Sequence, residues 1–292
     1  MEKIDKIVFG DNQFFGINHR SQEKAEELLK KFNNIDHIFE VYDNAIDCGI
    51  HSIMLNSNEK AAEITERFRN NKTKYGDLTW YPSIPYPYKY ANMVNELGIF
   101  PAINEVLFKG NSIGGVFGMM AKGGTALLGK DAMKMMEMLI DVEMKIFRGL
   151  DMRVIFLQNV ITDLVLGYDV KEVFLRYCDF IRKKYNVIPG FITLNLPYLK
   201  AKLEAWGIEE VVICSSINKA GFNMFPSKEE YEKVIATNDP NKYQLMGMST
   251  LASGSISPEE SFDYVNKLNL QSIVFGASSK NHIQSTVNLI RK

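Results

Sequence analysis

The sequence predicts a (β/α)₈ barrel that occupies residues 1–292 as a single domain, and three observations favour this fold. Eight apolar, β-rich runs recur along the chain, and each is followed by residues with helical periodicity. The runs are apolar on both faces, which is typical of parallel strands covered by helices on both sides. The length of 292 residues also suits a barrel of this type, which needs about 250 residues.

The expected elements alternate in order along the chain. The strands cover residues 4–10, 51–56, 78–84, 153–159, 188–195, 211–216, 243–250 and 271–276. The helices cover residues 21–32, 36–48, 59–71, a long stretch ending at 185, then 196–208, 227–237, 258–269 and a last helix reaching 292. Gly49 ends the second helix, SKEE at residue 227 matches a capping box, and Pro258 suits a first helical turn.

A doubly wound open sheet is the alternative fold. It would usually carry a GxGxxG turn after the first strand, whereas the turn here reads GDNQFFG. The alternation also pauses between the third and fourth strands, where residues 88–149 read as a helical insertion within the barrel. Eight of the 14 Met residues lie between Met119 and Met152. Met-rich helices are adaptable packing surfaces, so the insertion is interpreted as a packed extension, a subunit interface in a homo-oligomer or a lid over the barrel.

Composition excludes several classes of protein. Lys and Arg total 34 and Asp and Glu total 35, so the net charge of −1 shows no footprint for nucleic acid. There is no run of about 18 apolar residues to span a membrane, and the first residues lack the apolar core of a signal peptide. Three separated cysteines without a CxxC pair fit a reducing compartment. We therefore expect a cytoplasmic protein with neither nucleic-acid nor membrane partners.

The active site of such a barrel lies at the C-terminal ends of its strands. These ends carry amides and hydroxyls, with one carboxylate, and neutral groups of this kind suit sugars and other polyols. The alternative is helix capping, because Ser and Asn are favoured there. The expected hydroxyl-binding residues are Gln13, Asn56, Asn159, Asn195 and Asn218.

Asp11 and His19 are the candidate catalytic residues, both in the turn after the first strand. Asp11 would act as a general base whose pKa is raised by partial burial against Phe14 and Phe15, with His19 assisting. The alternatives are an Asx turn for Asp11 and a structural role for His19 before the first helix. Without HxH, HxxxH or paired carboxylates, no metal site is expected.

The last two strands are followed by Gly- and Ser-rich loops, STLASGSIS and FGASSKNHI, that lead into helices. Backbone N–H groups and the helix dipole attract anions at such positions, and barrels frequently bind phosphate there. The alternative is an ordinary Gly-Ser turn. The expected phosphate-binding residues are Gly254, Ser255, Gly276, Ser278 and Ser279.

Four segments resemble motifs of the aldo-keto reductases. They are NAIDCGIHSIMLNSNE at the second strand, VVICSSINKAGFN at the sixth, MGMSTLASGSISPEES at the seventh and SIVFGASSKNHI at the eighth. The resemblance is scattered over most of the chain and is more specific in its last 80 or so residues. It implies the same barrel and makes NADP a candidate cofactor.

The catalytic tetrad of that family does not carry over. Its Asp falls near Met54, its Tyr is missing, its Lys falls at or near Ser83, and its His falls at Gln158 or Asn159. Carbonyl reduction needs a proton donor beside the hydride acceptor, and none of the usual groups is present. The resemblance therefore implies a barrel that kept an anion site and changed or lost its reaction.

The leading hypothesis is an enzyme of lyase or isomerase type that acts by acid–base chemistry on a phosphorylated or nucleotide-linked small molecule, such as a sugar derivative, without a cofactor. One alternative is an NADP-dependent reductase with an altered tetrad. The other is a catalytically lapsed barrel that binds a metabolite or a protein partner.

Overall fold

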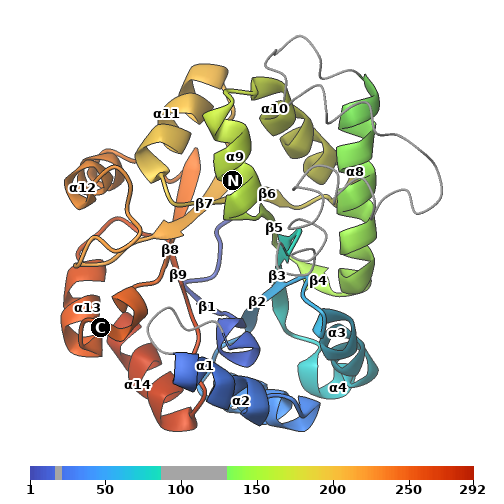
Figure 1. Cartoon of the computed structure of the whole chain (residues 1–292), viewed down its shortest axis with the longest axis vertical. Coiled ribbons are helices and arrows are strands. Elements are labelled where there is room, and N and C mark those ends of the chain that lie inside the picture. Colours follow the sequence, from blue (N-terminus) through green and yellow to red (C-terminus); the bar gives the residue numbers. More distant parts are fainter. Residues whose placement is uncertain (17–21, 87–129) are drawn as a thin grey trace.

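Parallel strands close into a barrel in the computed structural model, which describes residues 1–16, 22–86 and 130–292 (Figure 1). The strands are β1 (Ile7–Phe9), β2 (Ser52–Asn56), β3 (Thr79–Ile84), β4 (Asp151–Met152), β5 (Val154–Leu157), β6 (Ile188–Thr193), β7 (Val211–Ser216), β8 (Tyr243–Met248) and β9 (Ser272–Phe275). Their order is β2-β1-β9-β8-β7-β6-β5-β3-β4, and the β2–β3 pairing closes the ring. β4 and β5 both pair with β3, so they form one position of the barrel and the eight predicted strands are confirmed.

Helices surround these strands, as the ring in Figure 1 shows. They are α1 (Gln22–Lys31), α2 (Ile35–Asp47), α3 (Ala61–Asn70), α4 (Lys72–Tyr75), α8 (Lys130–Met144), α9 (Asn159–Gly167), α10 (Lys171–Phe180), α11 (Leu196–Trp206), α12 (Lys228–Ala236), α13 (Pro258–Val265) and α14 (Lys280–Ile290). In the parts of the chain that the structure describes, no helix has the length and apolar character to cross a membrane.

The structure divides one of the predicted helices and describes part of the predicted insertion. The long helix expected to end at residue 185 is divided into α9 and α10, because the chain turns at Asp169 with a left-handed φ of 55°. α10 then continues as a π-helical turn, Ile181–Tyr185. Of the expected helical insertion, α8 and the 3₁₀ turn Lys145–Phe147 are helical as predicted. Residues 88–129 of that insertion lie outside the described residues.

Alternation along the strands determines which side chains point into the barrel. The interior is filled by Ile4, Val8, Met54, Tyr81, Val154, Phe156, Ile192, Val212, Cys214, Met246 and Val274. Because side chains alternate along a strand, the inward residue comes again two positions later. The next inward positions after Met54, Tyr81 and Phe156 are Asn56, Ser83 and Gln158. The same strands that build the apolar interior therefore present polar side chains at their C-terminal ends.

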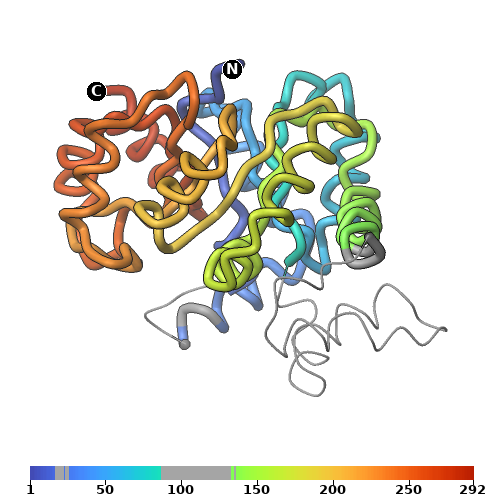
Figure 2. The backbone as a smooth tube through the Cα atoms, turned by 90° about the horizontal axis from the view of Figure 1, so that it is seen from above, coloured from blue at the N-terminus to red at the C-terminus, as the bar shows by residue number. Residues whose placement is uncertain are grey.

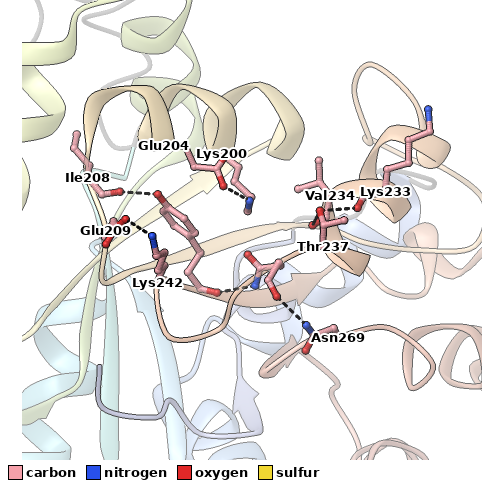
Figure 3. A network of polar contacts seen from close by, with 11 residues as sticks. Lys200, Glu204, Ile208, Glu209, Lys233, Val234, Thr237, Lys242 and Asn269 are labelled. Carbon is pink, nitrogen blue, oxygen red and sulfur yellow. Dashed lines mark hydrogen bonds and ion pairs between the residues drawn. The ribbon is translucent and has the colours of Figure 1, made fainter.

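The N-terminal ends of β7 and β8 are held by structural contacts. The Tyr243 hydroxyl donates to the carbonyl of Ile208 at 3.1 Å, and Lys242 Nζ pairs with Glu209 at 2.7 Å (Figure 3). Figure 2 shows both chain ends on one side of the molecule, and Met1 lies 3.7 Å from Glu210 on this same side. The opposite side, where the strands end, is left for the candidate site.

Gly190→Ala is expected to destabilise the barrel by on the order of 1–3 kcal/mol. Gly190 lies on β6, and an added Cβ would stand 2.5 Å from Phe156 Cδ1 and 2.7 Å from Val154 Cγ1, which is overpacking in a closed interior. Gly167→Ala is the matched control, because nothing lies within 4 Å of its added Cβ. Urea denaturation of both variants measures the difference, and equal free energies of unfolding would contradict this account of the packing.

Candidate active site

Asp11 accepts three hydrogen bonds at the C-terminal ends of β1 and β2. The backbone N–H of Asn56 donates to Oδ2 at 3.0 Å and its Nδ2 donates to Oδ1 at 2.5 Å. Asn58 Nδ2 donates to Oδ2 at 3.0 Å. The Asp11 side chain is only 2% exposed, so water contributes little to solvating its charge. Neutral amides hold the carboxylate in place.

These contacts continue along the neighbouring strands to β3 and β5. Gln158 Nε2 donates to Asn56 Oδ1 and, at 2.7 Å, to Ser83 Oγ. We call Asp11, Asn56, Asn58, Ser83 and Gln158 the amide cluster. It joins four strand ends that are far apart in the sequence, and all five members are buried. One carboxylate and a set of neutral hydrogen-bonding groups therefore meet in one place.

Burial raises the pKa of Asp11 to about 6, and the bonds from Asn56 and Asn58 oppose this rise. This is the direction expected from the sequence, and a catalytic role for Asp11 stays a prediction. Tyr42 on α2 lies nearby, and its buried hydroxyl has no hydrogen-bond partner in the part of the chain that the structure describes. Burial and the charge of Asp11 both raise the pKa of Tyr42, so this hydroxyl stays neutral.

Gln13 is placed at the eighth-strand loop rather than in the amide cluster. Its Nε2 donates to the Gly10 carbonyl at 2.8 Å, and its Oε1 is buried without a hydrogen-bond partner among the described residues. A Cβ added to Gly276 would stand 2.0 Å from this Oε1, so the Gln13 amide lies directly against Gly276. The structure thus brings Gln13 together with Gly276, two residues predicted for different roles.

Two of the other predicted amides make local backbone contacts. Asn195 caps α11 by accepting from the Tyr198 N–H at 3.2 Å. Asn218 bonds to both the N–H and the carbonyl of Phe222 at 2.9 Å, which closes the loop after β7. Asn159 is half-buried as the first residue of α9. The capping alternative accounts for the contacts of Asn195, and substrate binding by these three residues stays a prediction.

His19, the second predicted catalytic residue, lies outside the described residues. Within residues 1–16, 22–86 and 130–292 there is no group of three or more His, Cys, Asp or Glu side chains that could hold a metal ion.

The two predicted anion loops differ in their backbone geometry. The N–H groups of Gly254 and Ser255 donate to the Leu251 carbonyl at 2.7 and 3.0 Å, so they are engaged within their own turn. The Ser279 hydroxyl caps α14 by accepting from the His282 N–H at 3.4 Å. Backbone N–H groups are therefore engaged in both loops, within the turn in the first and by the helix cap in the second. Phosphate binding by either loop stays a prediction.

Lysines flank this second loop, and one of them could not be foreseen. Lys31 at the end of α1 lies 3.3 Å from the Ser278 carbonyl, across 247 positions of sequence. Lys280 opens α14 and pairs with Asp47 at 2.7 Å. No local pattern links Lys31 to the loop, because only the closure of the barrel brings α1 beside α14. Positive charge therefore gathers at the N-terminus of α14.

A cavity of about 500 Å³ lies at the other end of the barrel, between α10 and the residues that precede β7. Its charged groups already have partners, since Arg182 donates to the carbonyls of Glu209 and Glu210 and Glu209 pairs with Lys242. This cavity is remote from the amide cluster. It contributes nothing to the candidate site.

Known proteins match this chain in fold but not in sequence. No protein-family model matches the chain, and no curated protein matches it. A putative aldo-keto reductase from Pseudomonas aeruginosa superposes with a TM-score of 0.58 at 11% identity, covering 98% of this chain and 90% of that one. An aldo-keto reductase from a deep-sea metagenome library gives a TM-score of 0.54 at 10% identity, covering 99% and 91%. One from Bacillus halodurans, in a holo form, gives 0.52 at 10%, covering 98% and 87%. The barrel thus has the fold of the aldo-keto reductases.

Proposed function

We propose that this barrel is an enzyme of lyase or isomerase type that acts by acid–base chemistry on an anionic small molecule, such as a phosphorylated or nucleotide-linked sugar derivative. The observation that carries the proposal is the buried Asp11 carboxylate in the amide cluster. Burial raises its pKa to about 6, so the group is charged at pH 7 yet readily takes up a proton. This is the property that a general base requires.

The hydrogen bonds of Asp11 leave it able to act. A carboxylate offers about four acceptor positions, and three are used by the N–H groups of Asn56 and Asn58. The backbone N–H of Asp11 also bonds to its own carboxylate, so a proton is taken up in place of one of these donors. The neutral amides around it hold no competing charge, so the cluster both orients the base and suits an uncharged, hydroxyl-bearing part of a substrate.

The anionic part of the substrate would bind at the loop of Gly276, Ser278 and Ser279. The N-terminus of α14 supplies the positive end of the helix dipole, and Lys31 and Lys280 add two ammonium groups. Asp47 offsets part of the charge of Lys280, so Lys31 is the stronger contributor. The anionic end of the substrate would thus be held at this loop, and its hydroxyl-bearing end would react at Asp11.

An NADP-dependent reductase is the second candidate, and the shared fold with aldo-keto reductases favours it. In this reading NADPH would supply the hydride, and the loop flanked by Lys31 and Lys280 would hold its adenosine phosphate. A protonated Asp11 would supply the proton that the missing tetrad cannot. Both candidate functions use the same loop, so the binding of NADPH distinguishes between them.

Lys31→Glu is expected to abolish most of the rise in melting temperature that phosphate gives the parent protein through ligand linkage. Lys30→Glu is the matched control, because Lys30 is an exposed lysine on the same helix that no contact joins to the loop. A Lys31→Glu variant that responds to phosphate like the parent would place the anion elsewhere. In the same assay, micromolar binding of NADPH would replace the leading proposal by the reductase.

A further inference from the structure

The hydrogen bonds that link Gln158, Asn56 and Asp11 in the amide cluster all point toward Asp11, because a carboxylate can accept hydrogen bonds but not donate them. Asp11 therefore requires the NH₂ group of Asn56 to face it, as found, and this turns Asn56 Oδ1 toward β5. Gln158 must then direct its own NH₂ group at Asn56 Oδ1. The orientation of both amides, which is otherwise ambiguous, is thus set by the charge of Asp11.

This direction determines which atoms are left for a ligand. Both hydrogens of Gln158 Nε2 are used, one by Asn56 Oδ1 and one by Ser83 Oγ. Gln158 Oε1 has no hydrogen-bond partner among the described residues. It is also not one of the polar atoms that are both unpaired and fully enclosed. Ser83 Oγ accepts from Gln158 and is fully buried, so it holds the Gln158 amide in place and is closed to a ligand. One acceptor, Gln158 Oε1, remains at an inward position of the barrel.

We propose that Gln158 Oε1 is a specificity subsite that accepts a hydrogen bond from a hydroxyl group of the substrate, and that Asp11 is the positioning residue that fixes its polarity. A hydroxyl supplies the hydrogen that this oxygen requires. A carboxylate has no hydrogen for Gln158 Oε1 and is repelled by that carbonyl. This inference rests on the proposed function, because it names the substrate group recognised at the same site.

Protonation of Asp11 should allow this order of donors and acceptors to reverse, which makes the order measurable. Once protonated, the carboxyl can donate to Asn56, which allows Asn56 and then Gln158 to turn over. Of the described groups, Tyr42 on α2 faces Asp11 and stays neutral. Lys60, before α3, is directed away, because its Nζ donates to the carbonyls of Phe32 and Asn33. Asp11 itself is therefore the group whose titration should reach Gln158.

Side-chain amide NMR of ¹⁵N-glutamine-labelled protein tests this between pH 4.5 and 8. The Gln158 signal, identified by its loss in Gln158→Met, is expected to move with an inflection near pH 6. In Asp11→Asn the inflection should vanish. Gln244 is the internal control, since it is equally buried at the other end of the barrel, with its amide bonded to Glu2 and Ile4. A Gln158 signal that does not move, or moves equally in Asp11→Asn, overturns the positioning role.

The subsite is probed at pH 7.5 with ethylene glycol and with acetate. Ethylene glycol should shift the Gln158 signal, and acetate should shift it several-fold less at equal concentration. An equal or larger effect of acetate, or no effect of the diol, overturns the hydroxyl subsite. Neither measurement uses turnover. If Asp11→Asn leaves turnover intact while these signals behave as expected, the acid–base function fails and the subsite stands.

Discussion

Asp11→Asn is expected to lower turnover by on the order of 10²-fold or more while leaving the binding of phosphate at the loop before α14 nearly intact. Amides and hydroxyls bind substrates but do not move protons at neutral pH, and Asp11 is the carboxylate of the amide cluster. Asparagine keeps the size and an acceptor oxygen for Asn56, so the turn after β1 should survive. The measurement is kcat, together with the ligand-induced rise in melting temperature.

Asp163→Asn is the matched control for this prediction. Burial raises the pKa of Asp163 as well, but this carboxylate accepts from Thr193 Oγ1 at 2.5 Å and from the Leu194 N–H at 3.0 Å. It supports the loop after β6 and belongs to no part of the amide cluster. If Asp11→Asn retains full turnover and Asp11→Ala loses only about 1 kcal/mol of stability, Asp11 is a structural cap of its loop.

The strands were predictable because the signal for them is local. A strand buried on both faces must be apolar along its whole length, and turn residues mark its ends whatever it pairs with. The break between α9 and α10 was missed because it depends on the single backbone conformation of Asp169. Periodicity continues across such a break, so an apolar pattern alone does not reveal it.

The candidate site was predictable only in part, because residue type does not reveal a partner. Asn56 and Asn195 both end strands, yet Asn56 bonds to side chains 45 and 102 positions away while Asn195 caps the helix that follows it. Strand parity is a signal that would have favoured Gln158 over Asn159, since Gln158 follows Phe156 by two positions. The approach of Lys31 to Ser278 has no such signal, because it exists only once the barrel closes.

Asp11→Asn is also expected to change how the stability of the protein depends on pH. Because the pKa of Asp11 in the folded protein is about 6, above its ordinary value of 3.8, the neutral form is the one that the fold prefers. The stability that this preference contributes is fully present below pH 4 and is lost as the pH rises through 6. A shift of about two units corresponds to about 3 kcal/mol. The free energy of unfolding of the variant, relative to that of the parent, should therefore rise by up to about 3 kcal/mol between pH 4 and pH 8.

Urea denaturation of both proteins across this range measures that difference, in which the titrations of all other carboxylates cancel. Asp47→Asn is the control, because Lys280 lowers the pKa of the exposed Asp47 below its ordinary value of 3.8. Asp47 therefore stays charged across this range in both the folded and the unfolded protein, and the difference for this variant should be nearly flat. A flat difference for Asp11→Asn would mean that the N–H donors of Asn56 and Asn58 fully offset the burial of the charge. Asp11 would then be an ordinary carboxylate at pH 7, and the argument for a general base would fail with it.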